Sequence, residues 1–114
     1  MVSGWATCVL THWHREAGLF SLEEVIRRLT SAPARILGLK DRVLLREGFR
    51  ADMNVIDLDS LSESMPEMVS DFPGGTSRFI QRASGYAATL VNGKVILEDD
   101  SHTGVRAGTV LRGQ

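Results

Sequence analysis

The chain has 114 residues, of which 43% are apolar, and its 13 Lys and Arg against 14 Asp and Glu give a formal net charge of -1. This length and apolar content suit one ordinary soluble domain with one core. The balanced charge supplies no basic field for a phosphate backbone, which argues against nucleic-acid binding. Because the apolar runs are far too short for a membrane span and no signal-like segment opens the sequence, we expect a soluble, cytoplasmic protein.

The first predicted element is a helix over residues 5–17. Apolar side chains recur there at intervals of three and four residues: Trp5, Ala6, Val9, Leu10, Trp13 and Ala17. Ser3 suits the N-cap position and Gly18 suits the end of this helix.

His12 and His14 form an H-x-H pair within this helix, a spacing with which hydrolases often hold a metal ion. On a strand both imidazoles would share one face, because side chains alternate with a period of two. On a helix, two positions correspond to about 200° of rotation, so the rings diverge. We therefore predict that the two histidines do not bind one metal ion together, and that one packs while the other is solvated.

Two more helices are predicted from capping and proline signals. Ser21 and Glu24 match a capping box, in which the Ser21 hydroxyl accepts from the Glu24 amide and the Glu24 carboxylate accepts from the Ser21 N–H. The predicted buried stripe of this helix is Leu22, Val25, Ile26 and Leu29. Pro33 interrupts the pattern but fits the first turn of a third helix over residues 32–37, which Gly38 ends.

The remainder of the chain reads as short strands and turns. The strongest pattern is a hairpin of residues 86–91 and 94–97, joined by Asn92-Gly93, a dipeptide that tolerates the positive φ angles of a type I′ turn. Weaker strands are predicted at residues 43–45, 53–58, 79–81 and 109–111. The fold class is therefore α+β, with a helical segment over residues 1–38 and a β-rich segment over residues 39–114.

Several polar groups have a structural interpretation that outweighs a catalytic one. The acidic residues Asp57, Asp59, Glu63, Glu67 and Asp71 are not accompanied by His or Cys, and we expect a solvated loop with at most one helical turn. Gly74 and Gly75 before Arg78 do not match a phosphate-binding loop, so we expect a glycine turn with a surface arginine.

The remaining histidine and the single cysteine are also assigned no chemistry. His102 follows Asp99, Asp100 and Ser101, but adjacent residues in a turn do not converge as a catalytic triad. Cys8 cannot form an internal disulfide and is predicted to be a buried, inert thiol. Read this way, the sequence assigns no catalytic, metal-binding or cofactor-binding residue to this chain.

Five motifs nevertheless occur in a specific order: Thr-His-Trp-x-Arg (11–15), Ser-Leu-Glu-Glu (21–24), Leu-Thr-Ser-x-Pro-Ala (29–34), Gly-Leu-x-Asp-Arg (38–42) and Gly-x-x-Ala-Asp-x-x-Val-x-Asp (48–57). The tail adds Phe-Pro-Gly-Gly (72–75), Gln-Arg-Ala-Ser-Gly-Tyr (81–86), Leu-Val-Asn-Gly (90–93) and His-Thr-Gly (102–104). Together they resemble the carboxy-terminal region of the amidohydrolase superfamily, in particular its N-acyl-D-amino-acid deacylase (D-aminoacylase) group.

The resemblance implies a parent enzyme with a (β/α)8 barrel and one or two metal ions, commonly zinc, that activate a water for attack on an amide carbonyl. The family's ligands precede the helix that opens this chain, so none maps onto a residue here. His12 and His14 match the last barrel helix, with His14 at its variable position. The chain would then supply that helix, the following helices and carboxy-terminal strands of a small β-domain, a partial β-sandwich completed by amino-terminal strands that are missing here.

Two functional hypotheses follow. The first is the non-catalytic carboxy-terminal portion of a metal-dependent hydrolase acting on amide bonds. The resemblance implies N-acyl-D-amino acids as its substrates, and we expect this chain alone to be inactive. The alternative is a free-standing protein-interaction module that uses the helix face of Trp5, Val9 and Trp13. Since that face and the strand edges lack partners, we also expect a homodimer or higher oligomer.

Overall fold

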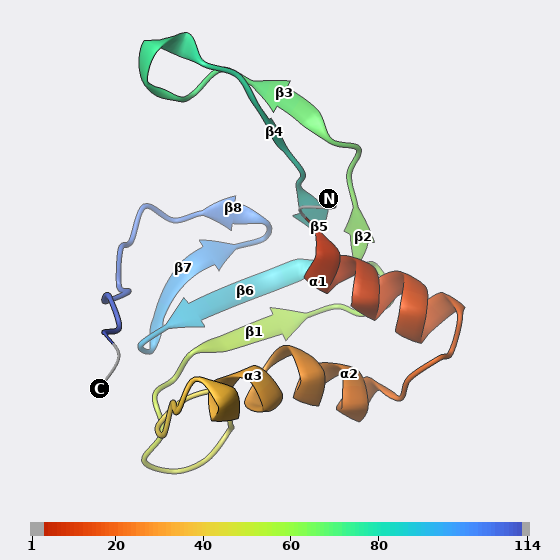
Figure 1. Cartoon of the computed structure of the whole chain (residues 1–114), viewed down its shortest axis with the longest axis vertical. Coiled ribbons are helices and arrows are strands. Elements are labelled where there is room, and N and C mark those ends of the chain that lie inside the picture. The colour runs from red at the N-terminus through yellow and green to blue at the C-terminus, as the bar shows by residue number, and fades with distance from the viewer. Residues whose placement is uncertain (1–3, 113–114) are drawn as a thin grey trace.

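The computed structural model describes residues 4–112, so the predicted cap residue Ser3 lies outside the described residues (Figure 1). Helices come first: α1 (Trp5–Cys8) continues into η1 (Val9–Glu16), followed by α2 (Leu22–Leu29) and α3 (Ser31–Ile36). Short strands and one helical turn follow: β1 (Met53–Ile56), β2 (Ser62–Glu63), β3 (Glu67–Val69), η2 (Pro73–Gly75), β4 (Arg78–Ile80), β5 (Ala83–Ser84), β6 (Tyr86–Val91), β7 (Lys94–Glu98) and β8 (Ser101–His102). All strand pairs are antiparallel, and the predicted α+β class is confirmed.

The first helix is continuous, as predicted, but its second half is a π-helix. The Ala17 amide donates to the His12 carbonyl oxygen at 2.8 Å, five residues back instead of four. The Thr11 hydroxyl donates at 3.0 Å to the Thr7 carbonyl oxygen, which the Thr11 amide would use in an α-helix. Gly18 follows the helix with φ +61°, a conformation that glycine adopts without steric cost.

The capping prediction for α2 is half right. The Ser21 hydroxyl accepts from the Glu24 amide at 3.2 Å, as predicted. The Glu24 carboxylate does not complete the box, because it accepts hydrogen bonds from Arg27 and Arg28. Charge-assisted hydrogen bonds to a guanidinium are stronger than a bond from a neutral amide, which favours this arrangement.

Only half of the predicted stripe of α2 is buried. Val25 is fully buried and Leu29 packs beside it, whereas Leu22 and Ile26 are exposed. Helix α3 begins one residue earlier than predicted, at Ser31.

The main sheet has the strand order β1-β6-β7-β8. The predicted hairpin is confirmed: Val91 pairs with Lys94, and Asn92 and Gly93 have φ angles of +53° and +77°. Figure 1 shows α2 and α3 running alongside β1.

Residues 53–90 form one long antiparallel hairpin with a loop in its first half. Ile56 pairs with Tyr86, and the Asp57 amide donates to the Gly85 carbonyl oxygen at 2.9 Å. Pairing resumes with Ser62 opposite Ser84, so residues 58–61 loop out of the ladder. Beyond this loop, residues 62–84 form an arm that projects away from the main sheet (Figure 1).

Two strand predictions and one loop prediction are wrong. Residues 43–45 form no strand, and Val43 has φ +64°, outside the β region. Residues 109–111 are irregular. The acidic stretch 57–71 is not a loop with a helical turn, because it contributes β2 and β3, which pair with β5 and β4.

One small core joins the helices to the hairpin. Leu10, Val25 and Leu61 are buried at its centre. Partly buried residues surround them: Val9, Phe20, Leu29, Ile56, Leu58 and Tyr86. The helical and β-rich segments therefore bury their apolar side chains together.

The chain exposes more surface than a folded protein of its size. Its accessible surface is 8645 Å² at 12.5 kDa, whereas a folded monomer of this mass exposes about 6,200 Å². Its radius of gyration is 15.7 Å, against about 13 Å for a compact domain of this length. The excess surface is roughly 2,400 Å². Within residues 4–112, no helix is long and apolar enough to cross a membrane.

Candidate functional site

His12 and His14 turn to different partners in the structure. His12 Nδ1 lies 3.0 Å from Glu16 Oε2 on the exposed side of η1. His14 Nδ1 lies 2.8 Å from the Phe20 carbonyl oxygen, and since a carbonyl only accepts, this nitrogen carries the proton. The structure therefore does not bring the two imidazoles together. Among the described residues, no three His, Cys, Asp or Glu side chains converge to hold a metal ion.

Arg15, the last residue of the Thr-His-Trp-x-Arg motif, fastens η1 to the hairpin. Its Nη1 donates to the carbonyl oxygens of Leu58 at 2.8 Å, Asp59 at 3.3 Å and Leu61 at 2.7 Å. These carbonyls belong to the loop at residues 58–61, which has left the β ladder. Nη1 carries two N–H groups, so the longer bond to Asp59 shares a hydrogen with one of the two shorter bonds, and one side chain reaches three loop carbonyls that have no ladder partner.

Leu61 and Gly85 form a second contact, between the loop at residues 58–61 and the backbone just before β6. Leu61 is fully buried in the core beside Leu10 and Val25. Gly85 has φ +104°, and a Cβ atom built on it would lie 2.6 Å from the Leu61 Cα and 2.9 Å from the Leu61 nitrogen. Only glycine lets the two backbones approach this closely.

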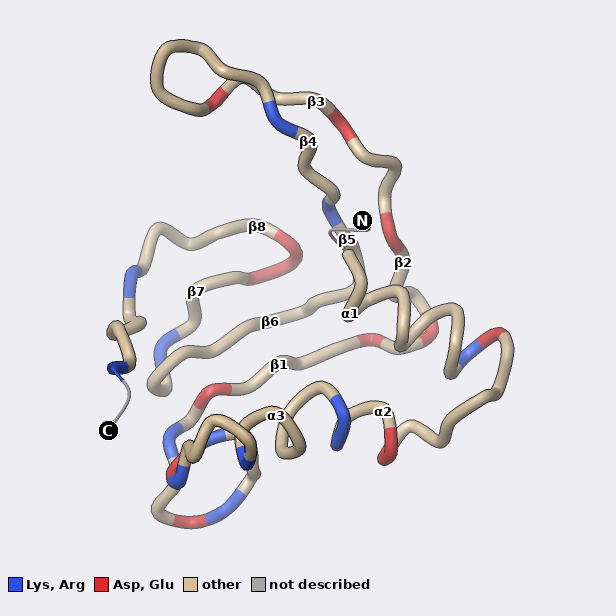
Figure 2. The backbone as a smooth tube through the Cα atoms, viewed as in Figure 1, with Lys and Arg blue, Asp and Glu red and all other residues tan. Residues whose placement is uncertain are grey.

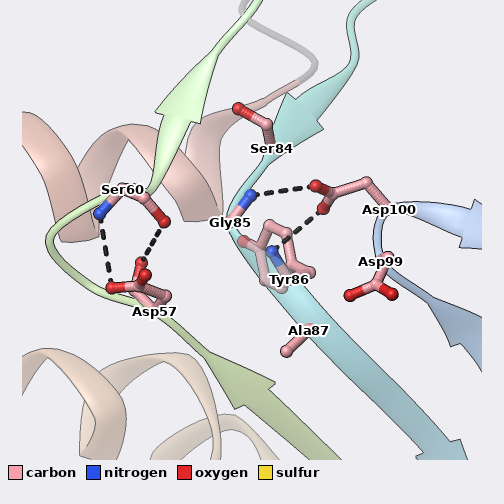
Figure 3. A pocket seen from close by; sticks show the side chains of 8 residues that line it. All are labelled: Asp57, Ser60, Ser84, Gly85, Tyr86, Ala87, Asp99 and Asp100. Carbon is pink, nitrogen blue, oxygen red and sulfur yellow. Dashed lines mark hydrogen bonds between the residues drawn. The ribbon is translucent and has the colours of Figure 1, made fainter.

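A polar cavity of about 360 Å³ opens beside this junction (Figure 3). It is lined by Asp57, Ser60, Ser84, Gly85, Tyr86, Ala87, Asp99 and Asp100. The Asp100 carboxylate accepts from the amides of Gly85 at 3.1 Å and Tyr86 at 2.9 Å. These two bonds tie the turn between β7 and β8 to the start of β6.

Asp57, on the opposite wall, is held in the same way. Its carboxylate accepts from the amides of Asp59 and Ser60, and the Ser60 hydrogen bonds lower the pKa of Asp57 below its ordinary value. Two of the three carboxylates in the lining thus accept hydrogen bonds from backbone amides. The lining contains no His, Cys or Lys.

An apolar groove of about 330 Å³ is formed by residues of α1, η1 and α2 and by Phe20 between the last two. It is lined by Trp5, Cys8, Val9, Trp13, Phe20, Val25, Arg28 and Leu29. Trp5 is 60% exposed and Trp13 is 45% exposed, and the Arg28 guanidinium stacks over the Phe20 ring at 4.7 Å. The predicted helix face of Trp5, Val9 and Trp13 is therefore an open apolar surface. We use the term groove face for the surface formed by Trp5, Val9, Trp13, Phe20 and Leu29.

Cys8 lines this groove and is only half-buried, so the prediction of a buried thiol is too strong. Burial raises the pKa of the Cys8 thiol, and the carboxylates of Glu63 and Glu16 raise it further. A raised pKa leaves less of the nucleophilic thiolate at neutral pH, which accords with the predicted low reactivity.

The glycine turn and the third histidine also have structural partners. Arg78 donates to the Asp71 carboxylate through Nε at 2.7 Å and Nη2 at 2.6 Å, which closes the tip of the arm around Gly74 and Gly75. His102 Nδ1 accepts from the Gly104 amide at 2.8 Å. The predicted glycine turn is confirmed, and Arg78 is held by a carboxylate within its own turn.

The sequence did not predict the contacts of Arg15, Leu61 and Asp100, because each of these residues contacts partners that lie far away along the chain. The available signal was the motif itself, in which Arg15 is the final fixed position.

The comparisons with known proteins agree with these motifs. A sequence profile described as the amidohydrolase family matches residues 2–97. D-aminoacylase of Alcaligenes xylosoxydans xylosoxydans is 35% identical over an alignment of 112 residues, which covers 94% of this chain and 21% of that protein. N-acyl-D-aspartate deacylase of the same organism is 35% identical over 95% of this chain and 20% of its own length.

Solved structures show the same relationship. A crystal structure of D-aminoacylase matches with a TM-score of 0.72 at 34% identity, covering 90% of this chain and 20% of that protein. A D-aminoacylase mutant in complex with copper chloride matches with a TM-score of 0.74 at 35% identity, over 93% and 20% of the two chains. Another matching structure concerns the binuclear metal centre of D-aminoacylase.

The profile match over residues 2–97 shows that the chain belongs to the amidohydrolase family. Within that family it is similar to D-aminoacylases, and it spans about a fifth of the length of the curated relatives that it matches.

Proposed function

We propose that the chain is the carboxy-terminal, non-catalytic portion of a metal-dependent hydrolase that cleaves the amide bond of N-acyl-D-amino acids. The observation that carries this proposal is the match to D-aminoacylase, at 35% identity over 94% of this chain but only 21% of that protein. The second deacylase match, to a protein named for N-acyl-D-aspartate, supports the same substrate class.

In this proposal the chain stabilises the rest of the enzyme and does not contribute to its metal site. Zinc ligands would lie outside residues 4–112, where no group of three suitable side chains converges. The groove face would pack on the barrel. The exposed surface supports this role, because an apolar face of this extent is unfavourable in water unless something covers it.

The first experiment assays the 114-residue chain by itself. We expect no hydrolysis of N-acetyl-D-methionine or N-acetyl-D-aspartate with or without added zinc. Zinc-dependent turnover that a chelator abolishes would show that the chain carries its own catalytic site.

A second experiment places the chain in a working enzyme. The segment of the Alcaligenes D-aminoacylase that matches this chain is replaced by it, and hydrolysis of N-acetyl-D-methionine is compared with that of the parent and of a truncated enzyme lacking the segment. We expect the chimera to retain activity and the truncated enzyme to lose it. A folded, metal-loaded chimera without activity would contradict the supporting role.

A further inference from the structure

We infer that the 114-residue chain on its own forms a symmetric homodimer in which the groove faces of two copies cover each other. This inference concerns the isolated chain and does not rest on the proposed function. Three observations carry it: the area available, the shape of the face and the charge at its rim.

The available area exceeds what a stable dimer needs. The chain exposes 8645 Å², roughly 2,400 Å² more than a folded monomer of its mass. A standard stable interface takes about 800 Å² from each partner. This excess is that of the whole chain, arm included, and it is about three times the contribution required of one copy, so covering the groove face alone needs only about a third of it.

The groove face offers both a projection and a hollow. Trp5 and Trp13 are 60% and 45% exposed, and the groove of about 330 Å³ lies beside them. In a two-fold interface the same patch meets itself, so an indole of each copy can enter the groove of the other. Tryptophan and arginine side chains in desolvated hollows supply much of the binding energy of protein interfaces.

The charge on this side does not oppose self-association. Figure 2 shows that the chain from α1 through most of η1 carries no charged residue before Arg15 and Glu16 at its end. Along α2, Glu23 and Glu24 balance Arg27 and Arg28, and Glu24 binds both arginines at 2.6 to 2.9 Å. Two copies of this face therefore meet without net like charge, which would otherwise oppose their association.

The test measures the mass of the purified chain by sedimentation velocity and light scattering from about 1 µM to about 100 µM. We expect twice the chain mass of 12.5 kDa. Trp13→Glu puts a charge on the groove face and should raise the dimer dissociation constant more than about thirtyfold. Leu45→Glu is the matched control, because Leu45 is 87% exposed in the segment after α3, and it should leave the dimer intact.

A monomer throughout this range, aggregates without a defined size, or a dimer that Trp13→Glu leaves unchanged would each overturn the inference. A monomer would leave the rest of a longer hydrolase as the partner of this face. If circular dichroism shows that Trp13→Glu is unfolded, Trp5→Glu replaces it, because Trp5 lines the same groove and is 60% exposed. A folded Trp5→Glu variant that remains a dimer with an unchanged dissociation constant would also overturn the inference.

Discussion

Arg15 forms hydrogen bonds to the loop at residues 58–61, which has no partner in the β ladder. Its guanidinium is 31% exposed and binds the carbonyl oxygens of Leu58, Asp59 and Leu61. One of those carbonyls belongs to Leu61, a fully buried core residue, and the other two lie just before it in the chain. A single side chain thus fixes both the loop geometry and the position of a core residue.

Arg15→Ala should therefore lower the free energy of unfolding by about 2 kcal/mol, because the loop carbonyls, including that of the buried Leu61, lose a charged donor. Arg15→Lys should recover only part of this loss, since the ammonium keeps the charge and several N–H donors on one nitrogen but sits on a shorter side chain than Nη1 of arginine. Urea unfolding monitored by circular dichroism measures the effect. Arg35→Ala, on an exposed position of α3, is the control, and an equal loss there would mean that the loop bonds contribute little.

Glu24 predicts a pH dependence in the acid range. The hydrogen bonds from Arg27, and then from Arg28, lower the pKa of Glu24 from 4.5 to about 2. A carboxyl whose pKa is lowered in the folded state stabilises the fold above its unfolded pKa and loses this contribution as the pH falls through the folded value. The stabilisation should therefore be complete above about pH 4.5 and disappear towards about pH 2.

In the Glu24→Gln variant, the urea midpoint should decrease less between about pH 4.5 and about pH 2 than it does in the wild type. Below about pH 2, the two proteins should respond to further acidification alike. Glu23→Gln is the matched control, because it removes a like charge from the same turn and leaves the Glu24 cluster in place. Added salt should shrink the difference, since the group is exposed. An identical acid profile for both variants would show that the ion cluster does not contribute to stability.

At the scale of elements, the junction between the long hairpin and the core depends on one glycine. Gly85→Ala places a methyl group 2.6 Å from the Leu61 Cα, in addition to the strain of φ +104°. We expect a loss of more than about 3 kcal/mol, because backbone must move against backbone. Gly104→Ala is the control with φ +87° and open space around the new atom, and should cost only about 1 kcal/mol. Thermal unfolding compares the two variants, and equal shifts would refute the close-contact explanation.

Elements encoded by neighbouring residues were predictable, and those that depend on distant partners were not. The Asn92-Gly93 hairpin and the Ser21 cap follow from residues two or three positions apart. Strand β2 pairs across 22 residues with Ser84, and its polar composition hides it from a hydrophobic pattern. The Arg15 contacts span 43 to 46 residues, so only the family motif pointed to that position.

For the molecule as a whole, the buried core is small compared with the length of the folded chain. Leu10, Val25 and Leu61 form its buried centre, while both tryptophans of the chain are largely exposed. Stability should therefore be concentrated where helices, loop and main sheet meet. The arm lies far from that centre (Figure 1) and carries exposed apolar residues at Met68 and Phe79, which pair across its strands.

Replacing residues 68–79 with Asn-Gly tests this distribution. The shortened arm keeps the Glu67 and Ile80 pair as its last rung, and a two-residue type I′ turn matches the twist of the strands. We expect the thermal midpoint to change by less than about 5 °C, because an isolated two-stranded ribbon contributes little stability. The same replacement of residues 58–61 removes Leu61 and should abolish cooperative unfolding. Comparable losses from both deletions would mean that the arm, too, is part of the folding core.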